Sequence, residues 1–554
     1  MVKRISYYIC LLCMSISTLL TAIDKRPALP LLQGIETITA LDFYRHIAYL
    51  GSDSLKGRAT GSQGERLAAD YIMDHLHKEN CLAGTASGYL QTIPMHGSYP
   101  LKSSELVINI DDKSVRLDLG QDYVLYKSGA QTFIPNPVPM VFVGYGIIAP
   151  EYDYNDYQSM DVTGKVVVYL SGEPPSDDPE YFLGKEPTIY SYPESKQRLA
   201  IARGARGSIM IPNSYNERRK TWDFWQNAFS FEDVTLAYSV TSHFSIMLHP
   251  NIAETLFTKP LDLQTVLKMD QDNTMSSFPL KSTLSFKGQF RQRDFFANNI
   301  IGIVPGSDPE LKSTYIICSA HYDHLGIGKA VRGDSVYNGV FDNAAGVAAL
   351  LQITKALNQI DVTPRRSIVF LFLTGEEKGV LGSTYYTDHP VYPLHKTVAN
   401  VNVDGVAMFD TFNDIVGIGS EYSTIENELS LIASVLGLGV SSLPSEFLRT
   451  ESFARSDQIV FAKAGIPSVM IMEGLDYRNL SKNQGLNRLI NWQTNIYHTP
   501  FDDLLQPMNL EASRQHVRFL FAFIWHLANT TKPPEWKPGV PYINARLQSI
   551  AEKK

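Results

Sequence analysis

Hydrophobic positions in the first part of the chain recur at helical spacing. Residues 40–80 are predicted to be helical, with Ile72 and Leu76 among the repeating apolar positions. Ser62 followed by Glu65 is a capping-box pattern, which indicates where a helix begins. The runs LVINI and VRLDL come next and predict strands.

The pattern changes between about 131 and 290. Short apolar runs such as PVPMVFVGYG and GKVVVYLSG are bounded by Gly and Pro, which is typical of strands and turns. SKQRLAIARGARGSIMI predicts a helix, a turn and a strand. This stretch holds no cluster of candidate metal ligands, and it predicts an inserted β-rich domain.

From about 298 onward, apolar runs alternate with helical patterns. The runs are NNIIGIV, TYIICS, SIVFLFL, VANVNV and IPSVMIM, and helices are expected between them and at 510–528. Continuous β-branched runs separated by helices predict an α/β fold with a mostly parallel mixed sheet sandwiched by helices.

The N-terminus has the pattern of a secretory signal peptide. Lys3 and Arg4 precede an apolar stretch over residues 5–20, and small or polar residues follow up to Ala22. No second hydrophobic span of membrane length follows, so we expect cleavage rather than stable membrane insertion. The chain is therefore predicted to be exported, to the periplasm or outside the cell.

These patterns divide the chain into five segments. They are a signal peptide at 1–22, two parts of one main domain at 23–130 and 291–535, the insert at 131–290, and a C-terminal tail at 536–554.

Composition restricts the function classes. Hydrophobic residues make up 44% and charged residues 19% of the chain, as in globular proteins. The net charge of −8 comes without a basic face, so no nucleic-acid partner is expected. Cys318 lies in an apolar run and is expected to be a buried free thiol, with a bridge to Cys81 as the alternative.

Polar residues able to bind a metal follow several of the predicted strands. His321 comes after TYIICSA, Glu376 and Glu377 after IVFLFLTG, and Asp404 after VANVNV. Sites in such sheets form beyond the carboxyl ends of the strands, so these side chains are expected to converge. Asp342, which opens a helix, and His498, in a late loop, complete the candidate set.

This set suits a pair of zinc ions. Zinc binds histidine nitrogen and carboxylate oxygen, and two zinc ions can clamp an attacking oxygen. Three carboxylates and two neutral histidines would leave two Zn²⁺ ions with a net charge of about +1. Such a centre lowers the pKa of water and polarises a carbonyl group.

The motifs HYDHLG, FDNAAG, LTGEEKG, VNVDG and YHTPFDD closely resemble those of the co-catalytic dizinc aminopeptidases. This family includes leucyl aminopeptidases and aminopeptidase Y, with glutamate carboxypeptidase among its relatives. The resemblance covers about 298–530 and the opening stretch YLGSDSLKGRATGSQGERLAADYI. The insert is similar to a protease-associated domain, as GYGI and GKVVVYLSG indicate.

The resemblance implies a zinc-exopeptidase-like fold and a role for each candidate metal ligand. His321 and Asp404 would bind one zinc ion, Glu377 and His498 the other, and Asp342 would bridge the two. It also implies a cis peptide bond after Asp342.

Three further roles are implied. Asp323 would orient the imidazole of His321 through its carboxylate. Glu376 would activate a metal-bridging water and later protonate the leaving amine. Tyr497 would hydrogen-bond the developing oxyanion, with a packing role as the alternative. Gln458 departs from the family, which often has histidine after Ser-Asp.

The implied function is hydrolysis of the N-terminal peptide bond of peptides by an exported metallopeptidase with two zinc ions. The alternatives are a single-zinc glutaminyl cyclotransferase, a carboxypeptidase, and an inactive binding protein of the same fold. The insert speaks against the cyclotransferase, and the complete ligand set speaks against the inactive protein. The oligomeric state is left open.

Overall fold

The computed structural model describes residues 29–125, 133–184, 187–213, 221–240, 243–444, 447 and 449–553. The chain divides into two compact units. Met1–Ile93 and Phe296–Lys554 form the first, here called the discontinuous unit, and Pro94–Phe295 form the second, the inserted unit. The predicted signal peptide at 1–22 lies outside the described residues.

The centre of the discontinuous unit is a mixed sheet with a parallel core. β18 (Ser367–Leu373), β15 (Tyr315–His321), β19 (Thr397–Asn402) and β22 (Ser468–Glu473) are neighbours and run parallel. β14 (Phe290–Val304) pairs antiparallel with β18, and β20 (Asp414–Ile418) pairs antiparallel with β22. This arrangement confirms the predicted fold class.

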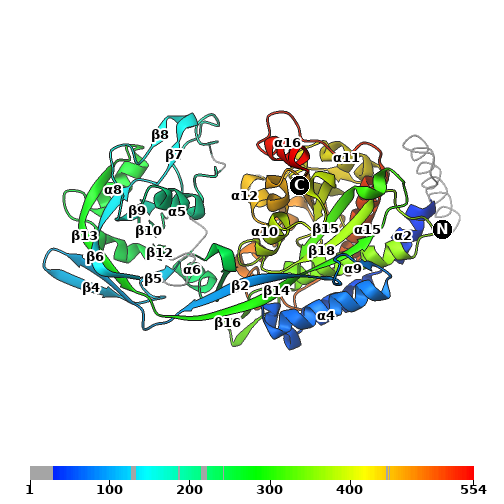
Figure 1. Cartoon of the computed structure of the whole chain (residues 1–554), viewed down its shortest axis with the longest axis horizontal. Coiled ribbons are helices and arrows are strands. Elements are labelled where there is room, and N and C mark those ends of the chain that lie inside the picture. The colour runs from blue at the N-terminus through cyan, green and yellow to red at the C-terminus, as the bar shows by residue number, and fades with distance from the viewer. Residues whose placement is uncertain are drawn as a thin grey trace. The chain divides into compact units, whose positions relative to one another are not determined.

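Helices cover both faces of this sheet. Ile316, Cys318 and Ala320 of β15 pack in the core that includes α3 (Ala40–Leu50), α4 (Gln63–Lys78), α9 (Ala345–Asn358) and α15 (Leu510–Asn529). Ile317, between them, faces the opposite core with α10 (Leu381–Asp388) and α13 (Gln458–Lys463). Both faces of β15 are therefore buried, which explains why its sequence is apolar throughout (Figure 1).

Shorter elements complete the discontinuous unit. The helices are α2 (Leu29–Thr37), α11 (Ile425–Val435), α12 (Arg449–Ala454), α14 (Lys482–Asn495) and α16 (Ile543–Glu552). The strands are β1 (Leu82–Ala83), β21 (Gly439–Val440) and the hairpin of β16 (Gly326–Val331) with β17 (Asp334–Tyr337). Within the expected tail at 536–554, residues 543–552 form α16, and its Arg546 donates to the carbonyls of Leu394 and Thr397 at 3.0 Å.

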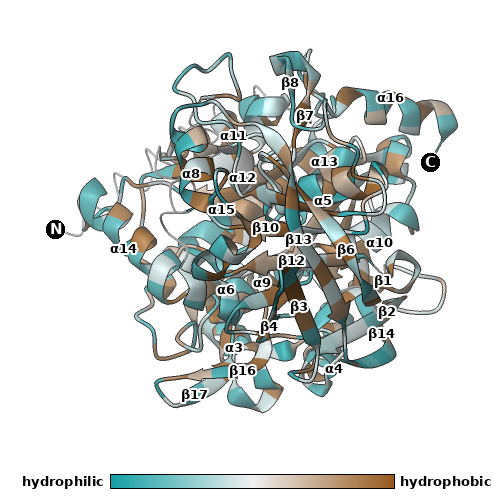
Figure 2. Cartoon of the chain, turned by 90° about the vertical axis from the view of Figure 1, so that its left-hand side faces the viewer, coloured by the Kyte–Doolittle hydropathy of each residue, from teal (hydrophilic) through white to brown (hydrophobic). Residues whose placement is uncertain are grey.

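The inserted unit has its own eight-stranded sheet, whose order is β4-β3-β13-β6-β9-β10-β12-β5. In Figure 2, hydrophobic residues, drawn in brown, lie along β3 and β10. The strands are β3 (Glu105–Ile110), β4 (Lys113–Leu117), β5 (Tyr123–Leu125), β6 (Phe133–Val143), β9 (Val166–Leu170), β10 (Gly207–Ile211), β12 (Phe244–Leu248) and β13 (Ser277–Lys287). The helices are α5 (Pro193–Ala202), α6 (Trp222–Ala228), α7 (Pro250–Ala253) and α8 (Leu263–Gln271).

The inserted unit begins at Pro94, earlier than the boundary at 131 expected from the sequence. β3 pairs with β13, and β4 pairs with β3. The runs LVINI and VRLDL therefore belong to this sheet. β13 lies far along the chain from β3, so the local pattern could not show to which sheet this pair of strands belongs.

Cys81 and Cys318 are both buried and free, so the alternative of a bridge between them is wrong. Among the described helices, none combines the length and apolar character that crossing a membrane requires.

Candidate metal centre

The carboxyl ends of the central strands carry the predicted site residues. His321 is the last residue of β15, Glu377 follows β18, and Asp404 follows β19. Asp342 lies in the turn Val340–Ala344, which leads into α9, and His498 lies in the loop after α14. Parallel strands end at one edge of the sheet, so these segments meet there.

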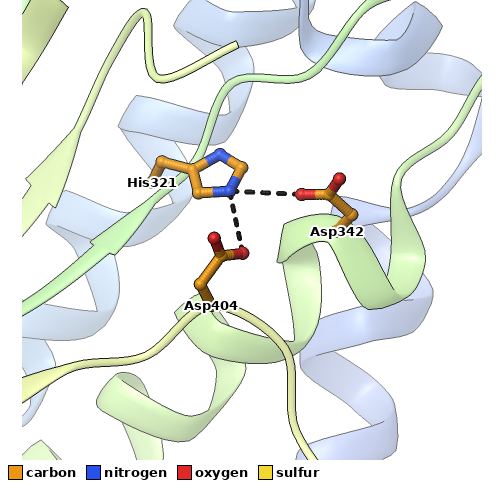
Figure 3. A group of neighbouring side chains, drawn as sticks. All are labelled: His321, Asp342 and Asp404. Carbon is orange, nitrogen blue, oxygen red and sulfur yellow. Dashed lines mark hydrogen bonds and ion pairs between the residues drawn. The ribbon is translucent and has the colours of Figure 1, made fainter. Parts of the chain in front are cut away.

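One imidazole lies against two carboxylates. The Nε2 atom of His321 is 3.2 Å from Oδ1 of Asp342 and 3.2 Å from Oδ1 of Asp404. Figure 3 shows the three side chains pointing toward one another from β15, the turn before α9 and the loop after β19. His321 is buried, and Asp404 is partly open to solvent.

A second imidazole lies on the other oxygen of Asp342. The Nε2 atom of His498 is 3.2 Å from Oδ2 of Asp342 and 3.1 Å from Oε2 of Glu377. Asp342 thus presents one oxygen to each imidazole. All five predicted ligands are brought together, and Asp342 lies between the two pairs.

The donor set and its spacing fit two metal ions. Two ligands about 2.0 Å from one tetrahedral zinc are separated by roughly 3.3 Å. The four imidazole–carboxylate distances of 3.1 and 3.2 Å are close to this value. Nε2 of His498 is buried and has no hydrogen-bond partner among the described residues. A buried nitrogen without a hydrogen bond beside two carboxylate oxygens is suited to metal binding.

The crowding of acidic groups changes the protonation of the imidazoles. Burial alone lowers the pKa of His498, but Glu377 and Asp342 outweigh it and raise the pKa to about 10. For His321, burial is likewise outweighed by Asp404 and Glu376, and its pKa is raised. Without a metal ion, both imidazoles therefore hold protons that a metal would displace.

Glu376 lies beside this centre. Burial raises the pKa of its carboxyl group well above the usual range; His321 opposes this, and Asp404 adds to it. A carboxylate with a raised pKa next to a metal centre is suited to accept and return a proton.

Asp323 contacts both His321 and Glu376. Nδ1 of His321 lies 3.2 Å from the carbonyl oxygen of Asp323 but 3.7 Å from its carboxylate. That carboxylate also accepts from the backbone N–H of Glu376 at 3.1 Å and from the hydroxyl of Thr60 at 3.0 Å. The carbonyl thus makes the shorter contact with Nδ1 of His321, and the carboxylate of Asp323 makes a longer ion pair with the same nitrogen, so its orienting role stays a prediction.

Tyr497 stacks on His498, with ring centroids 3.8 Å apart and planes 22° apart. Its ring also lies 5.4 Å from that of Trp492. Burial, followed by Asp342, raises the pKa of the phenol well above its usual value, so the hydroxyl keeps its proton. These ring contacts give Tyr497 a packing role, and its hydrogen bond to the developing oxyanion stays a prediction.

The turn of Asp342 is held by residues to which no sequence pattern assigned a role. The peptide bond between Asp342 and Asn343 is cis, as the resemblance implied. The side chain of Asn343 donates to the carbonyl of Val403 at 2.8 Å and accepts from the N–H of Gly405 at 3.0 Å. Asn343 therefore links the turn of Asp342 to the loop of Asp404.

Asp502, in the motif YHTPFDD, holds the same turn from the other side. It is buried, and its carboxylate accepts from the backbone N–H groups of Phe341 at 2.9 Å and Asp342 at 3.0 Å. The motif YHTPFDD is visible in the sequence, but it does not show that Asp502 accepts hydrogen bonds from the backbone of Phe341 and Asp342.

Arg58 is fully buried, with a relative exposure of 1%. Its guanidinium donates to the carbonyls of Tyr322 at 2.8 Å, Asn338 at 2.7 Å and Gly339 at 2.9 Å, and also to that of Leu50. It thereby joins the segments that follow His321 and precede Asp342. The motif LKGRATG carries this residue, and its role was not predicted.

Gln458 lies behind the centre rather than in it. Its side chain accepts from Asn402 at 2.9 Å and donates to the carbonyl of Phe453 at 2.9 Å. This buried amide ties the end of β19 to the segment before α13, which gives it a structural role.

Residues 299–524 match the model of Peptidase family M28. Leupeptin-inactivating enzyme 1 of Streptomyces exfoliatus is 28% identical over 44% of this chain and 51% of that protein. Aminopeptidase NAALADL1 of Mus musculus is 32% identical over 23% of this chain and 16% of that protein. The chain thus spans about half or less of the length of these relatives.

Among solved structures, the fold is similar to that of an aminopeptidase from Aneurinibacillus sp. strain AM-1. The TM-score is 0.55 at 17% identity, over 91% of this chain and 98% of that chain. At this identity the likeness shows the fold.

Proposed function

We propose that this chain, which contains a Peptidase family M28 domain at residues 299–524, is an exported dizinc aminopeptidase. Its substrates would be peptides, and it would hydrolyse their N-terminal peptide bond. The observation that carries the proposal is the position of Asp342, whose two carboxylate oxygens each lie 3.2 Å from a different imidazole.

The residues toward the metal ions are assigned by these pairs. His321 and Asp404 would hold one zinc ion, Glu377 and His498 the other, and Asp342 both. Two zinc ions in such a site lower the pKa of water and polarise the carbonyl group of the substrate.

Glu376 would carry out the proton transfers of the reaction. Its carboxylate would accept a proton from the attacking water and deliver it to the leaving amine as the peptide bond breaks. The carboxylate of Asp323 supports this role because it holds the backbone of Glu376 at 3.1 Å.

Two observations favour this function over its alternatives. A single-zinc cyclotransferase does not need a second imidazole–carboxylate pair around Asp342. The related proteins named as aminopeptidases favour action at the N-terminus over carboxypeptidase action. Export remains part of the proposal on the strength of the signal pattern at residues 1–22.

One set of substrates tests the proposal. A peptide is supplied with a free N-terminus, with an acetylated N-terminus and with an amidated C-terminus, and products are identified by mass. We expect release of the first residue from the free and amidated peptides and none from the acetylated one. Cleavage from the C-terminus, or cyclisation of an N-terminal glutamine without hydrolysis, would contradict it.

A further inference from the structure

Glu377 contacts a second imidazole that none of the predicted roles includes. Its Oε2 faces His498 at 3.1 Å, whereas its Oε1 lies only 2.6 Å from Nδ1 of His324. His324 is the second histidine of the motif HYDHLG and is fully buried.

The two distances have different physical meanings. Two ligands of one tetrahedral zinc lie roughly 3.3 Å apart, so 2.6 Å is too close for His324 and Glu377 to share an ion through these atoms. A hydrogen bond from an N–H group to a carboxylate is about 2.7–2.9 Å long, which is much nearer to the observed distance. An ionised carboxylate only accepts, so Nδ1 of His324 carries the proton.

The surroundings of His324 hold its ring in place. Its backbone N–H donates to the carbonyl of Arg58 at 3.1 Å. Gly339 lies against the ring, since a Cβ atom there would be 2.5 Å from Cγ of His324. Gly339 also has a positive φ of 61°, so glycine is favoured there on both grounds. The ring therefore has little room to turn toward a metal ion.

We propose that His324 is a positioning residue for Glu377. Its Nδ1–H donates to Oε1, which leaves Oε2, the oxygen nearer His498, for the zinc ion that Glu377 and His498 would hold. This inference rests on the proposed function, because it assigns His324 a role at one of its two metal positions. His324 lies with Asp342 and Glu377 in a group whose potential ligand atoms are within 4.8 Å of one another, but in this role it would contact neither substrate nor metal.

A matched pair of variants tests the role of the Nδ1–H group. In His324→Asn, the side-chain amide nitrogen can take the place of Nδ1 and donate to Glu377. In His324→Gln, the amide reaches the place of Nε2 instead. Metal-free wild type and both variants are titrated with zinc against a competing chelator, which yields the affinity of each metal position.

We expect wild type to bind two zinc ions. His324→Gln should weaken one of the two affinities by about 10- to 100-fold and leave the other unchanged, as for other groups that orient a metal ligand. His324→Asn should restore most of the loss. Thermal unfolding of the metal-free proteins serves as a control, since a general loss of structure would weaken both positions.

Three results would overturn the inference. They are wild-type affinities in His324→Gln, equal weakening of both positions, and loss of one whole zinc in both variants, which would make His324 a ligand. Wild type that fails to bind two zinc ions would overturn the proposed function as well, so the two failures are distinguishable.

Discussion

Both units of this protein bury charged side chains, but they satisfy them differently. In the inserted unit, Asp156 accepts from the backbone N–H groups of Tyr145 at 3.0 Å and Ile147 at 2.9 Å, and from the hydroxyl of Tyr154 at 2.8 Å. Lys196, also buried, donates to three backbone carbonyls, among them that of Tyr145 at 2.7 Å. Each group finds its partners within the unit.

In the discontinuous unit, the candidate metal centre gathers acidic groups around two imidazoles instead. Asp342, Glu377 and Asp404 lie at distances suited to shared ions, and the buried Nε2 atom of His498 has no hydrogen bond among the described residues. A buried charged group with all its partners is structural, whereas a cluster that needs a cation to complete it indicates a site.

The largest expected effect is a loss of activity, which a substitution in the metal centre should cause and a substitution in the inserted unit should not. Glu376→Gln should lower kcat by about 10²- to 10⁴-fold, because the amide can no longer take up the proton. Zinc content should be unchanged, since Glu376 is not a ligand. The control is Glu173→Gln in the inserted unit, where the carboxylate of Glu173 accepts from the backbone N–H of Thr188 at 2.8 Å; this variant should keep kcat. Steady-state kinetics with elemental analysis measure both, and normal turnover in Glu376→Gln would remove that residue from the mechanism.

The second-largest expected effect is a loss of zinc, which distinguishes a substitution in the metal centre from one in the inserted unit. Asp342→Ala should lose both zinc ions together, because both pairs use this carboxylate. Asp156→Ala should retain zinc but unfold more easily, by about 1–3 kcal/mol, since it leaves buried donors unpaired. Elemental analysis and denaturant unfolding measure the two outcomes. Two zinc ions retained by Asp342→Ala would rule out its bridging position.

Zinc uptake should release protons. The pKa of His498 in the metal-free protein is raised to about 10, and that of His321 is also raised, so both imidazoles are protonated at neutral pH. Binding enthalpies measured in buffers of different ionisation enthalpy give the number of protons released. About two per pair of zinc ions is expected, and none would show that both imidazoles are already neutral before the metal binds.

The smallest expected effect concerns pH and the inserted unit. Burial raises the pKa of Asp156 from 3.8 to about 6, despite its hydrogen bonds. Between these values the folded protein binds the proton more tightly than the unfolded chain. The free energy of unfolding should therefore fall as the pH rises through this window, by up to roughly 3 kcal/mol.

Asp156→Asn is the matched variant for this measurement, because its side chain stays neutral. Denaturant unfolding of both proteins between pH 4 and about 6 should give a difference that grows with pH. A constant difference would show that Asp156 is ionised throughout and that its partners outweigh its burial.

Much of the metal centre could be predicted because several of its residues come at or just after the ends of predicted strands. β15, β18 and β19 are apolar runs, and parallel strands place the residues after them at one edge. The predicted family resemblance is confirmed by the match over residues 299–524. The five predicted ligands lie together, and their roles as ligands remain to be tested.

The supporting residues could not be predicted in the same way. Arg58, Asn343 and Asp502 act on backbone groups of segments that lie far from them in the chain or across a turn. The carboxylate of Asp323 forms the ion pair with His321 that its predicted role requires, but its hydrogen bond from the backbone N–H of Glu376 was not predicted. Such contacts depend on the folded path of the main chain, which side-chain patterns do not encode locally.

The central claim is that Asp342 stands between two metal positions, and the metal content of the wild-type protein tests it most directly. The protein is equilibrated with zinc, freed of excess ions and analysed for zinc per chain. Two tightly held zinc ions are predicted. One zinc ion would favour a single-metal enzyme such as a cyclotransferase, and none would contradict the assignment of all five ligands.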